Sequence, residues 1–194
     1  GPERMRAVYD YGADAVYAGS PRYSLRARNN EFAKLDVLEQ GIKEAHERNK
    51  KFFLTVNTLP HNSKLKTFVA DMEPLIAMKP DALIMADPGL IMTVREKWPE
   101  MPIHLSVQAN TTNYWGVKFW QNIGVERIIL SRELSMEEIA EIRQECPDIE
   151  LEVFIHGALC IAYSGRCLLS GYFNHRDPNQ GTCTNSCRWD YKVH

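Results

Sequence analysis

Six short apolar segments that alternate with helical patterns constrain the fold of this chain more than any other feature. The apolar segments cover residues 15–18, 51–56, 82–86, 103–107, 127–130 and 150–155. Amphipathic patterns typical of helices cover residues 2–11, 35–49, 63–78, 90–97, 113–123 and 135–145. Strands that are apolar throughout and are joined by helices form a parallel sheet covered by helices, because both faces of such a sheet are buried. The sequence therefore predicts an α/β fold with a parallel sheet.

The spacing of the strands bears on the type of parallel fold. A repeat of roughly 20 to 37 residues suits a (β/α) barrel at least as well as an open doubly wound sheet. No GxGxxG or Walker loop follows the first strand, which lowers the support for a nucleotide-binding Rossmann fold. The pattern begins with a helix and offers fewer strands than a full barrel needs. We expect residues 1–155 to form a TIM-barrel-like parallel barrel, truncated so that its first and last strands are missing, and residues 156–194 to form a cysteine-rich loop.

Four of the five cysteines lie within a window of 28 residues: Cys160, Cys167, Cys183 and Cys187. Disulfides are not expected in a chain of this size and ordinary composition. Structural zinc sites more often use two tight C-x2-C pairs, whereas a 4Fe–4S cluster takes four thiolates and tolerates irregular spacing on a loop. The spacing predicts a metal site and leaves both zinc and iron–sulfur open.

Polar side chains follow the ends of the predicted strands, where parallel α/β folds carry their chemistry. We expect substrate-binding residues at five of these positions: Arg26, Arg28, Asn57, Gln108 and Asn110. We expect catalytic residues at three more: Arg132, Glu133 and His156. The three arginines suit a carboxylate or a phosphate, and Arg26 and Arg28 share one side of an extended loop. His156 is interpreted equally well as a proton donor or as a satisfied buried histidine, and any of the others as a helix cap.

Aromatic residues and arginines are interleaved in the cysteine-rich loop. The aromatic residues are Tyr163, Tyr172, Phe173 and Trp189, and the arginines are Arg166, Arg176 and Arg188. Such residues stack on unpaired bases of nucleic acids, or they pack around a buried cluster and exclude water. We favour packing around a cluster. The net charge of −2 gives no global sign of nucleic-acid binding, so a polyanion would have to meet a local patch.

Nothing in the sequence indicates a membrane or an export route. No apolar run approaches the roughly 18 residues of a membrane span, and no signal peptide is present. Unpaired cysteines without an export signal indicate a reducing compartment. We expect a cytoplasmic protein.

Six segments are distinctive: YGADAVYAG, YSLRARNNEF, DALIMADPGL, MPIHLSVQAN, ILSRELS and the run from His156 to Trp189. Together they resemble the collagenase-like protease family, peptidase family U32. Within this family the sequence looks like the branch that hydroxylates the wobble uridine of tRNA to 5-hydroxyuridine without oxygen. The resemblance implies a barrel-like fold, a 4Fe–4S cluster, and tRNA and prephenate as partners. It also implies that Cys160, Cys167, Cys183 and Cys187 are the cluster ligands, and that relatives extend beyond both ends of this sequence.

Two other functions stay open. A peptidase is suggested by the family name, and Cys160 four residues after His156 resembles a dyad. The sequence has no HExxH helix and no GxSxG elbow, which weakens this alternative. A metal-stabilised RNA-binding module without chemistry of its own is the third interpretation.

Overall fold

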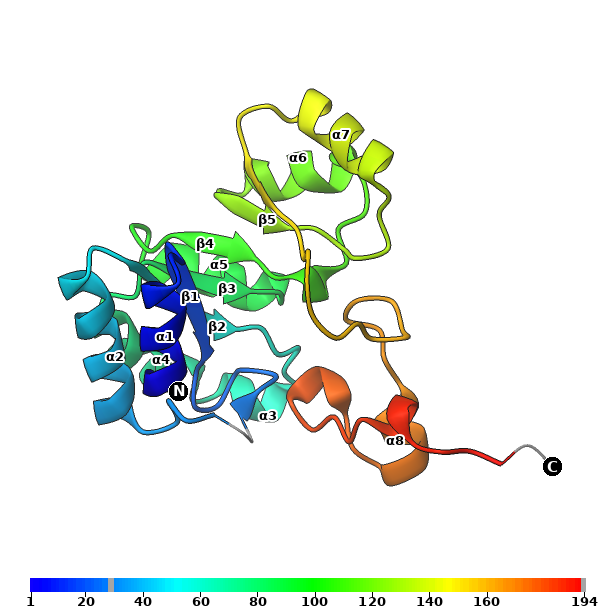
Figure 1. Ribbon diagram of the computed structural model, residues 1–194, viewed down its shortest axis with the longest axis horizontal. Coiled ribbons are helices and arrows are strands. Elements are labelled where there is room, and N and C mark those ends of the chain that lie inside the picture. The colour runs from blue at the N-terminus through cyan, green and yellow to red at the C-terminus, as the bar shows by residue number, and fades with distance from the viewer. Residues whose placement is uncertain (28–29, 193–194) are drawn as a thin grey trace.

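A six-stranded parallel sheet forms the centre of the computed structural model, which describes residues 1–27 and 30–192 (Figure 1). The strands are β1 Ala15–Gly19, β2 Lys51–Val56, β3 Ala82–Met85, β4 Ile103–Leu105, β5 Arg127–Ile129 and β6 Glu150–Glu152. Each strand pairs in parallel with the next one along the chain, in the order β1-β2-β3-β4-β5-β6. A doubly wound sheet reverses its strand order at a switch point, whereas the order of this sheet follows the chain throughout. The alternative of an open doubly wound sheet is therefore wrong. The sheet curls into a half-barrel; a truncated TIM barrel remains a prediction.

Eight α-helices and three described 3-10 turns accompany the sheet in the part of the chain that the structure describes. The helices are α1 Pro2–Asp10, α2 Leu35–Glu47, α3 Asn62–Leu65, α4 Phe68–Ala77, α5 Pro88–Lys97, α6 Tyr114–Asn122, α7 Met136–Glu145 and α8 Leu169–Asn174. The 3-10 turns are η2 Val107–Ala109, η3 Pro178–Gln180 and η4 Ser186–Arg188. None of these helices is long and apolar enough to cross a membrane.

The helix predicted over residues 63–78 is divided into α3 and α4. The hydroxyl of Tyr23 donates a hydrogen bond of 3.1 Å to the carbonyl oxygen of Lys64, which a continuous helix would pair with the amide of Phe68. Thr67 then starts α4 with a backbone that is not fully helical. The helical pattern correctly predicts helix in this region, but it does not reveal that Tyr23 interrupts the helix after its first turn.

Side chains of the strands alternate between the two faces of the sheet. On the helix-covered face, Phe52, Leu54 and Leu83 are fully buried in a large core shared with the helices. On the concave face, Phe53 and Ile84 belong to a smaller buried cluster. Burial of one such side chain contributes roughly 2 kcal/mol. Both faces are covered at the centre of the sheet, which explains why these strands are apolar throughout.

Local caps start two of the helices directly after a strand. The carboxylate of Asp87 accepts a hydrogen bond of 2.9 Å from the amide of Leu90 and so caps the start of α5. Ser135 and Glu138 form a capping box at the start of α7. Each cap contributes about 1 kcal/mol and fixes where the loop after the strand ends.

The last strand is shorter than predicted. β6 pairs only with β5, through Glu150, Leu151 and Glu152, and residues 153–155 are exposed and outside the strand. From there the chain turns back across the carboxyl ends of the strands and continues to α8 (Figure 1). The described residues 156–192 are called the cysteine-rich segment below.

Candidate functional site

The cysteine-rich segment is hydrogen-bonded to the strand-end residues of β4 and β5. One carboxylate oxygen of Glu133 accepts hydrogen bonds from the amide and the hydroxyl of Ser164, at 2.7 and 3.3 Å. The side-chain amide of Asn110 donates to the hydroxyl of Ser131 at 3.1 Å and to Glu133 at 3.4 Å. Arg166 donates to the amide oxygen of Asn110 at 3.3 Å. Because Ser164 is buried and its partner is charged, this contact fixes the segment firmly.

Gly165 makes this close approach sterically feasible. Its φ is +72°, and a Cβ placed there would overlap the carbonyl oxygen of Gln108 and lie 3.0 Å from the carbonyl carbon. Only glycine adopts this conformation without strain and leaves room for the neighbouring backbone. Gln108 therefore meets the segment through its main chain.

A second contact holds the segment against the loops after β1 and β2. The amide of Leu59 donates to the carbonyl oxygen of Asn179 at 3.1 Å. Gly181, with φ +87°, packs so closely that an added Cβ would lie 2.9 Å from the carbonyl oxygen of Ser24. The side chain of Asn179 also donates to the carbonyl oxygen of Cys167 at 3.1 Å. The segment thus spans the strand ends from β1 and β2 to β4 and β5.

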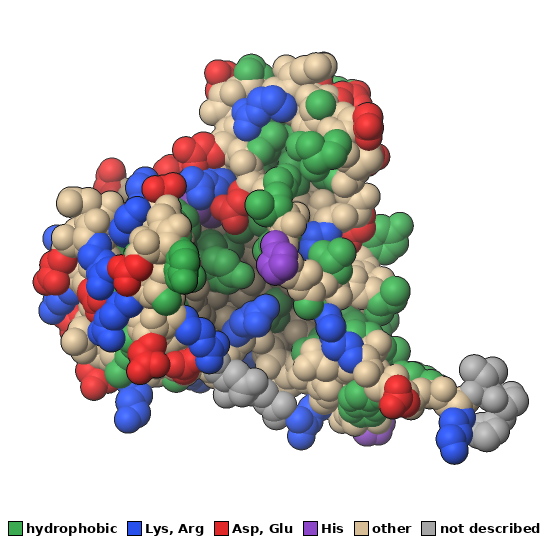
Figure 2. Space-filling view, in the orientation of Figure 1, with side chains coloured by type: hydrophobic (Ala, Val, Ile, Leu, Met, Phe, Trp, Pro, Cys, Tyr) green, Lys and Arg blue, Asp and Glu red, His purple; other side chains and the backbone are tan. Residues whose placement is uncertain are grey.

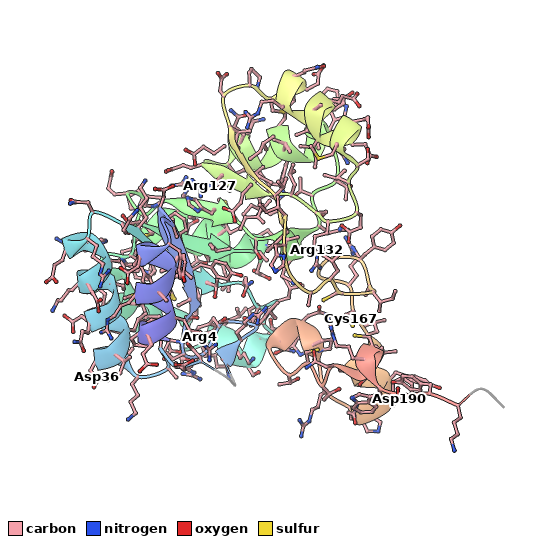
Figure 3. All side chains as sticks on the ribbon, in the orientation of Figure 1. Arg4, Asp36, Arg127, Arg132, Cys167 and Asp190 are labelled. Atoms are coloured by element: carbon pink, nitrogen blue, oxygen red, sulfur yellow. The ribbon has the colours of Figure 1, made fainter. Side chains whose placement is uncertain are left out.

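Asn57 and Arg132 complete this contact region. The side-chain oxygen of Asn57 accepts from the amide of Leu25 at 3.3 Å, and its nitrogen donates to the hydroxyl of Ser106 at 3.2 Å. Arg132 donates to the hydroxyl of Ser164 at 3.3 Å. Its guanidinium lies 5.9 Å from the centre of the Phe154 ring. In Figure 3 Arg132 and Cys167 lie on the side of the molecule where the segment crosses the strand ends.

The structure brings together five of the predicted site residues and places two others at the surface. The five are Asn57, Gln108, Asn110, Arg132 and Glu133. Arg26 is exposed, and the backbone before it forms a turn, closed by the Ala27 amide on the carbonyl oxygen of Ser24 at 3.2 Å. The prediction of an extended loop is therefore wrong up to residue 27, and Arg28 lies outside the described residues.

His156 is exposed, so the interpretation as a buried histidine is wrong. Residues 153–163 form neither a helix nor a strand, and no hydrogen bond joins His156 to Cys160. The spacing of four residues therefore does not place the two side chains on one helical turn. Ser164, Gly165 and Gly181 were not predicted as site residues; the glycines after polar residues in the loop were the only signal in the sequence.

The cysteines have the right chemistry for a metal cluster but are not gathered around one point. All five are free, and Cys160, Cys183 and Cys187 are exposed. The amide of Asn185 donates to the sulfur of Cys183 at 3.4 Å. Within residues 1–27 and 30–192, no three His, Cys, Asp or Glu side chains are arranged to hold a metal ion. Four thiols suit an iron–sulfur cluster, but their placement does not form its site, and the cluster stays a prediction.

Cys146 differs from the other four. It is buried, and burial raises the pKa of its thiol, with further effects from Lys118 and Glu145. Its sulfur lies 3.7 Å from the carbonyl oxygen of Tyr114. It is a small residue of the hydrophobic core.

A separate hollow of about 390 Å³ lies at the opposite, amino-terminal ends of the strands. Lys51, Phe53 and His104 line it together with Arg127 and Glu150. His104 is only 6% exposed, and its Nδ1 atom has no hydrogen-bond partner in the described part of the chain. Burial, and then the positive charge of Arg127, lower the pKa of His104 to about 4.

Comparison with known proteins identifies the family. The profile of peptidase family U32 matches residues 1–194. The chain belongs to peptidase family U32. It is 69% identical over 191 residues to tRNA hydroxylation protein P of Haemophilus influenzae, which covers 98% of this chain and 41% of that protein. It is 36% identical over 183 residues to the 23S rRNA 5-hydroxycytidine C2501 synthase of Escherichia coli, which covers 94% of this chain and 27% of that protein. The chain thus spans less than half of the length of these relatives.

A solved structure supports the same fold. The U32 peptidase Mk0906 superposes with a TM-score of 0.64 at 15% identity, over 78% of this chain and 64% of that protein. At this identity the similarity concerns the fold alone. The expectation of membership in this family is confirmed by the profile match.

Proposed function

We propose that this chain is part of a tRNA-modifying enzyme that hydroxylates the wobble uridine to 5-hydroxyuridine without oxygen, with a 4Fe–4S cluster and prephenate. One observation carries the proposal. Two relatives that match nearly the whole chain are named for the hydroxylation of RNA, one of tRNA and one of a cytidine in ribosomal RNA. The chemistry that they share is the hydroxylation of RNA.

The geometry at the strand ends supports a role for Arg132 in binding the co-substrate. Arg132 forms no ion pair with a carboxylate in the described part of the chain, and one contact to the hydroxyl of Ser164 leaves other guanidinium donors available. Prephenate carries two carboxylates, and a guanidinium binds a carboxylate through two parallel hydrogen bonds. We assign the proton transfer to His156, which is exposed at the start of the segment.

The same geometry gives Glu133 and Asn110 a role in positioning. Their hydrogen bonds are occupied by Ser164 and Arg166 of the cysteine-rich segment. They therefore hold that segment, and with it Cys167, over the strand ends. We propose Cys160, Cys167, Cys183 and Cys187 as cluster ligands, because four free cysteines on one segment supply the donors that a cluster needs. Such a cluster supplies the redox chemistry that no side chain can provide.

The test uses the full-length protein purified without oxygen, beside a Cys167→Ser variant. We expect a broad absorbance near ~400 nm, with iron and sulfide bound, that is weakened or lost in the variant. In a strain that lacks the gene, the wild-type gene should restore 5-hydroxyuridine in tRNA, and the variant should not, as measured by mass spectrometry of nucleosides. Folded protein that contains zinc or no metal would contradict the cluster. Unchanged 5-hydroxyuridine in the deletion strain would contradict the reaction.

The peptidase alternative has less support from the structure. Its strongest candidate was the pair His156 and Cys160, which no hydrogen bond joins and no helix aligns. The remaining support for a peptidase is the name of the family. An Arg132→Ala variant separates the two functions, because only the hydroxylase depends on an anionic co-substrate.

A further inference from the structure

Four aromatic side chains of the cysteine-rich segment form one exposed cluster. The centre of the Phe173 ring lies 5.1 Å from that of Tyr172, 6.4 Å from that of Trp189 and 5.4 Å from that of Tyr191. Tyr172 is 80% exposed, and the other three rings are also exposed. We call Tyr172, Phe173, Trp189 and Tyr191 the aromatic platform. The rings are exposed in the described structure, and the interpretation that aromatic residues of this segment pack around a cluster stays a prediction.

The platform is held by a hydrogen-bond network and is not a set of loose side chains. The hydroxyl of Tyr191 donates to the carbonyl oxygen of Ser186 at 2.7 Å. Asn174, at the end of α8, donates to the hydroxyls of Thr184 and Ser186, both at 3.1 Å. Ser186 is buried, so these bonds tie α8 to η4. Rings on a fixed support lose little conformational entropy when they bind a flat ligand.

The part of the chain that carries the platform has a net positive charge. The cysteine-rich part of the sequence, residues 156–194, holds four Lys or Arg (Arg166, Arg176, Arg188 and Lys192) and two Asp, although the whole chain has a net charge of −2. In Figure 2, blue and green side chains predominate over red ones in the region where Figure 1 shows α8. A surface that combines cations with exposed rings is complementary to unpaired nucleotides, whose phosphates are anionic and whose bases have flat faces.

The platform is also close to the cysteines along the chain. α8 begins two residues after Cys167, and Trp189 follows Cys187 by two residues. Ser170 of α8 donates to the sulfur of Cys183 at 3.9 Å. The fold unit that carries the rings therefore also carries the proposed redox site.

We propose that the aromatic platform stacks unpaired bases of an RNA loop and so presents a neighbouring base to the cysteine-rich segment. This inference rests on the proposed function, because RNA is taken as the substrate. Stacking selects single-stranded RNA over a duplex, in which the faces of the bases are already covered. The inference assigns Tyr172 as the outermost stacking residue and Arg176 and Arg188 as phosphate contacts.

The test measures the binding of a fluorescent anticodon stem-loop RNA to the full-length protein. Stacking on one ring contributes ~1–3 kcal/mol per base, so Tyr172→Ala should weaken binding about tenfold or more. Tyr172→Trp should bind as well as wild type, whereas Tyr172→Leu, which keeps apolar bulk without a π-face, should be as weak as alanine. Trp115→Ala on α6 is the matched control, because Trp115 is 69% exposed on a different helix. A blunt RNA duplex should show no dependence on Tyr172.

Salt and activity measurements complete the test. Arg176→Ala should reduce the slope of log affinity against log salt by about one. Wild-type affinity in Tyr172→Leu would overturn the proposal, because RNA binding would then not depend on a π-face at this position. If the wild type hydroxylates RNA and Tyr172→Ala does so with the same KM, the role proposed for the platform is wrong and the proposed function stands. Loop binding that depends on Tyr172 in a protein without hydroxylase activity would support the platform and contradict the proposed function.

Discussion

Replacing Gly165 by alanine should detach the cysteine-rich segment from the strand ends while the sheet stays folded. Gly165 has a φ of +72°, and an added Cβ would overlap the carbonyl oxygen of Gln108. Neither group can move cheaply, because both belong to the backbone. Gln108 lies in η2, directly after β4, and Ser164 beside the glycine is bonded to Glu133.

The size of the effect follows from these contacts. A left-handed conformation costs an alanine ~1–2 kcal/mol. Relief of the overlap requires the segment to move away, which breaks the hydrogen bonds of Ser164 to Glu133. Hydrogen bonds to a charged group contribute ~1.5–3 kcal/mol each. The two hydrogen bonds and the backbone conformation together amount to about 4–8 kcal/mol, so we expect the detached state to dominate.

Hydrogen exchange and limited proteolysis measure this detachment. The amide of Ser164 should exchange at least a hundredfold faster in Gly165→Ala, and proteases should cleave within residues 156–168. The thermal midpoint of the sheet should change by only a few degrees. Gly157→Ala is the control, because Gly157 also has a positive φ, +132°, but nothing lies within 4 Å of an added Cβ. Equal exchange in the two variants would refute the steric argument.

Three further predictions concern the sheet and its edge. The folded pKa of His104 is about 4, below the ordinary 6.5, so stability is full above pH 6.5 and falls by about 3 kcal/mol as the pH drops toward 4. His104→Phe should flatten this dependence in urea unfolding measured at several pH values. Ser135→Ala removes the capping box of α7 and should cost about 1 kcal/mol in the same assay. Glu133→Gln keeps an oxygen that accepts the hydrogen bond from Ser164, so the segment should stay resistant to proteases. The free energy of docking should fall by about 1 kcal/mol, because the acceptor is no longer charged. If that variant loses activity a hundredfold with its segment still docked, Glu133 acts in catalysis and not in positioning.

The sheet was predictable because its signals are local. The run from Lys51 to Val56 is apolar and bounded by polar residues, and β2 has the same limits. Ser135 and Glu138 have the S-x-x-E spacing of a capping box, and both of its hydrogen bonds form at the start of α7. The division of α3 from α4 was not predictable, since it depends on Tyr23, which lies 41 residues before Lys64.

The candidate site was predictable in position but not in the partners of its residues. Parallel strands that end in polar residues place those residues at one edge, so Asn57, Asn110 and Glu133 were found together. Their main partners are groups of the chain itself, among them the buried Ser164. No pattern in the sequence gives the pairing of a strand end with a loop that begins more than twenty residues later. The steric role of Gly165 depends on the same pairing, so it was missed for the same reason.

The two glycine contacts lie on either side of Cys167 in the sequence, whereas the other three proposed ligands lie outside them. Cys167 lies between Gly165 and Gly181, and the side chain of Asn179 holds its carbonyl oxygen. Cys160 precedes the first contact, and Cys183 and Cys187 follow the second; all three are exposed. If the four cysteines share a cluster, as we propose, Cys167 is the ligand that docking to the strand ends holds most directly. Docking of the segment would then precede cluster binding, because a detached segment has no fixed thiol around which the others can assemble.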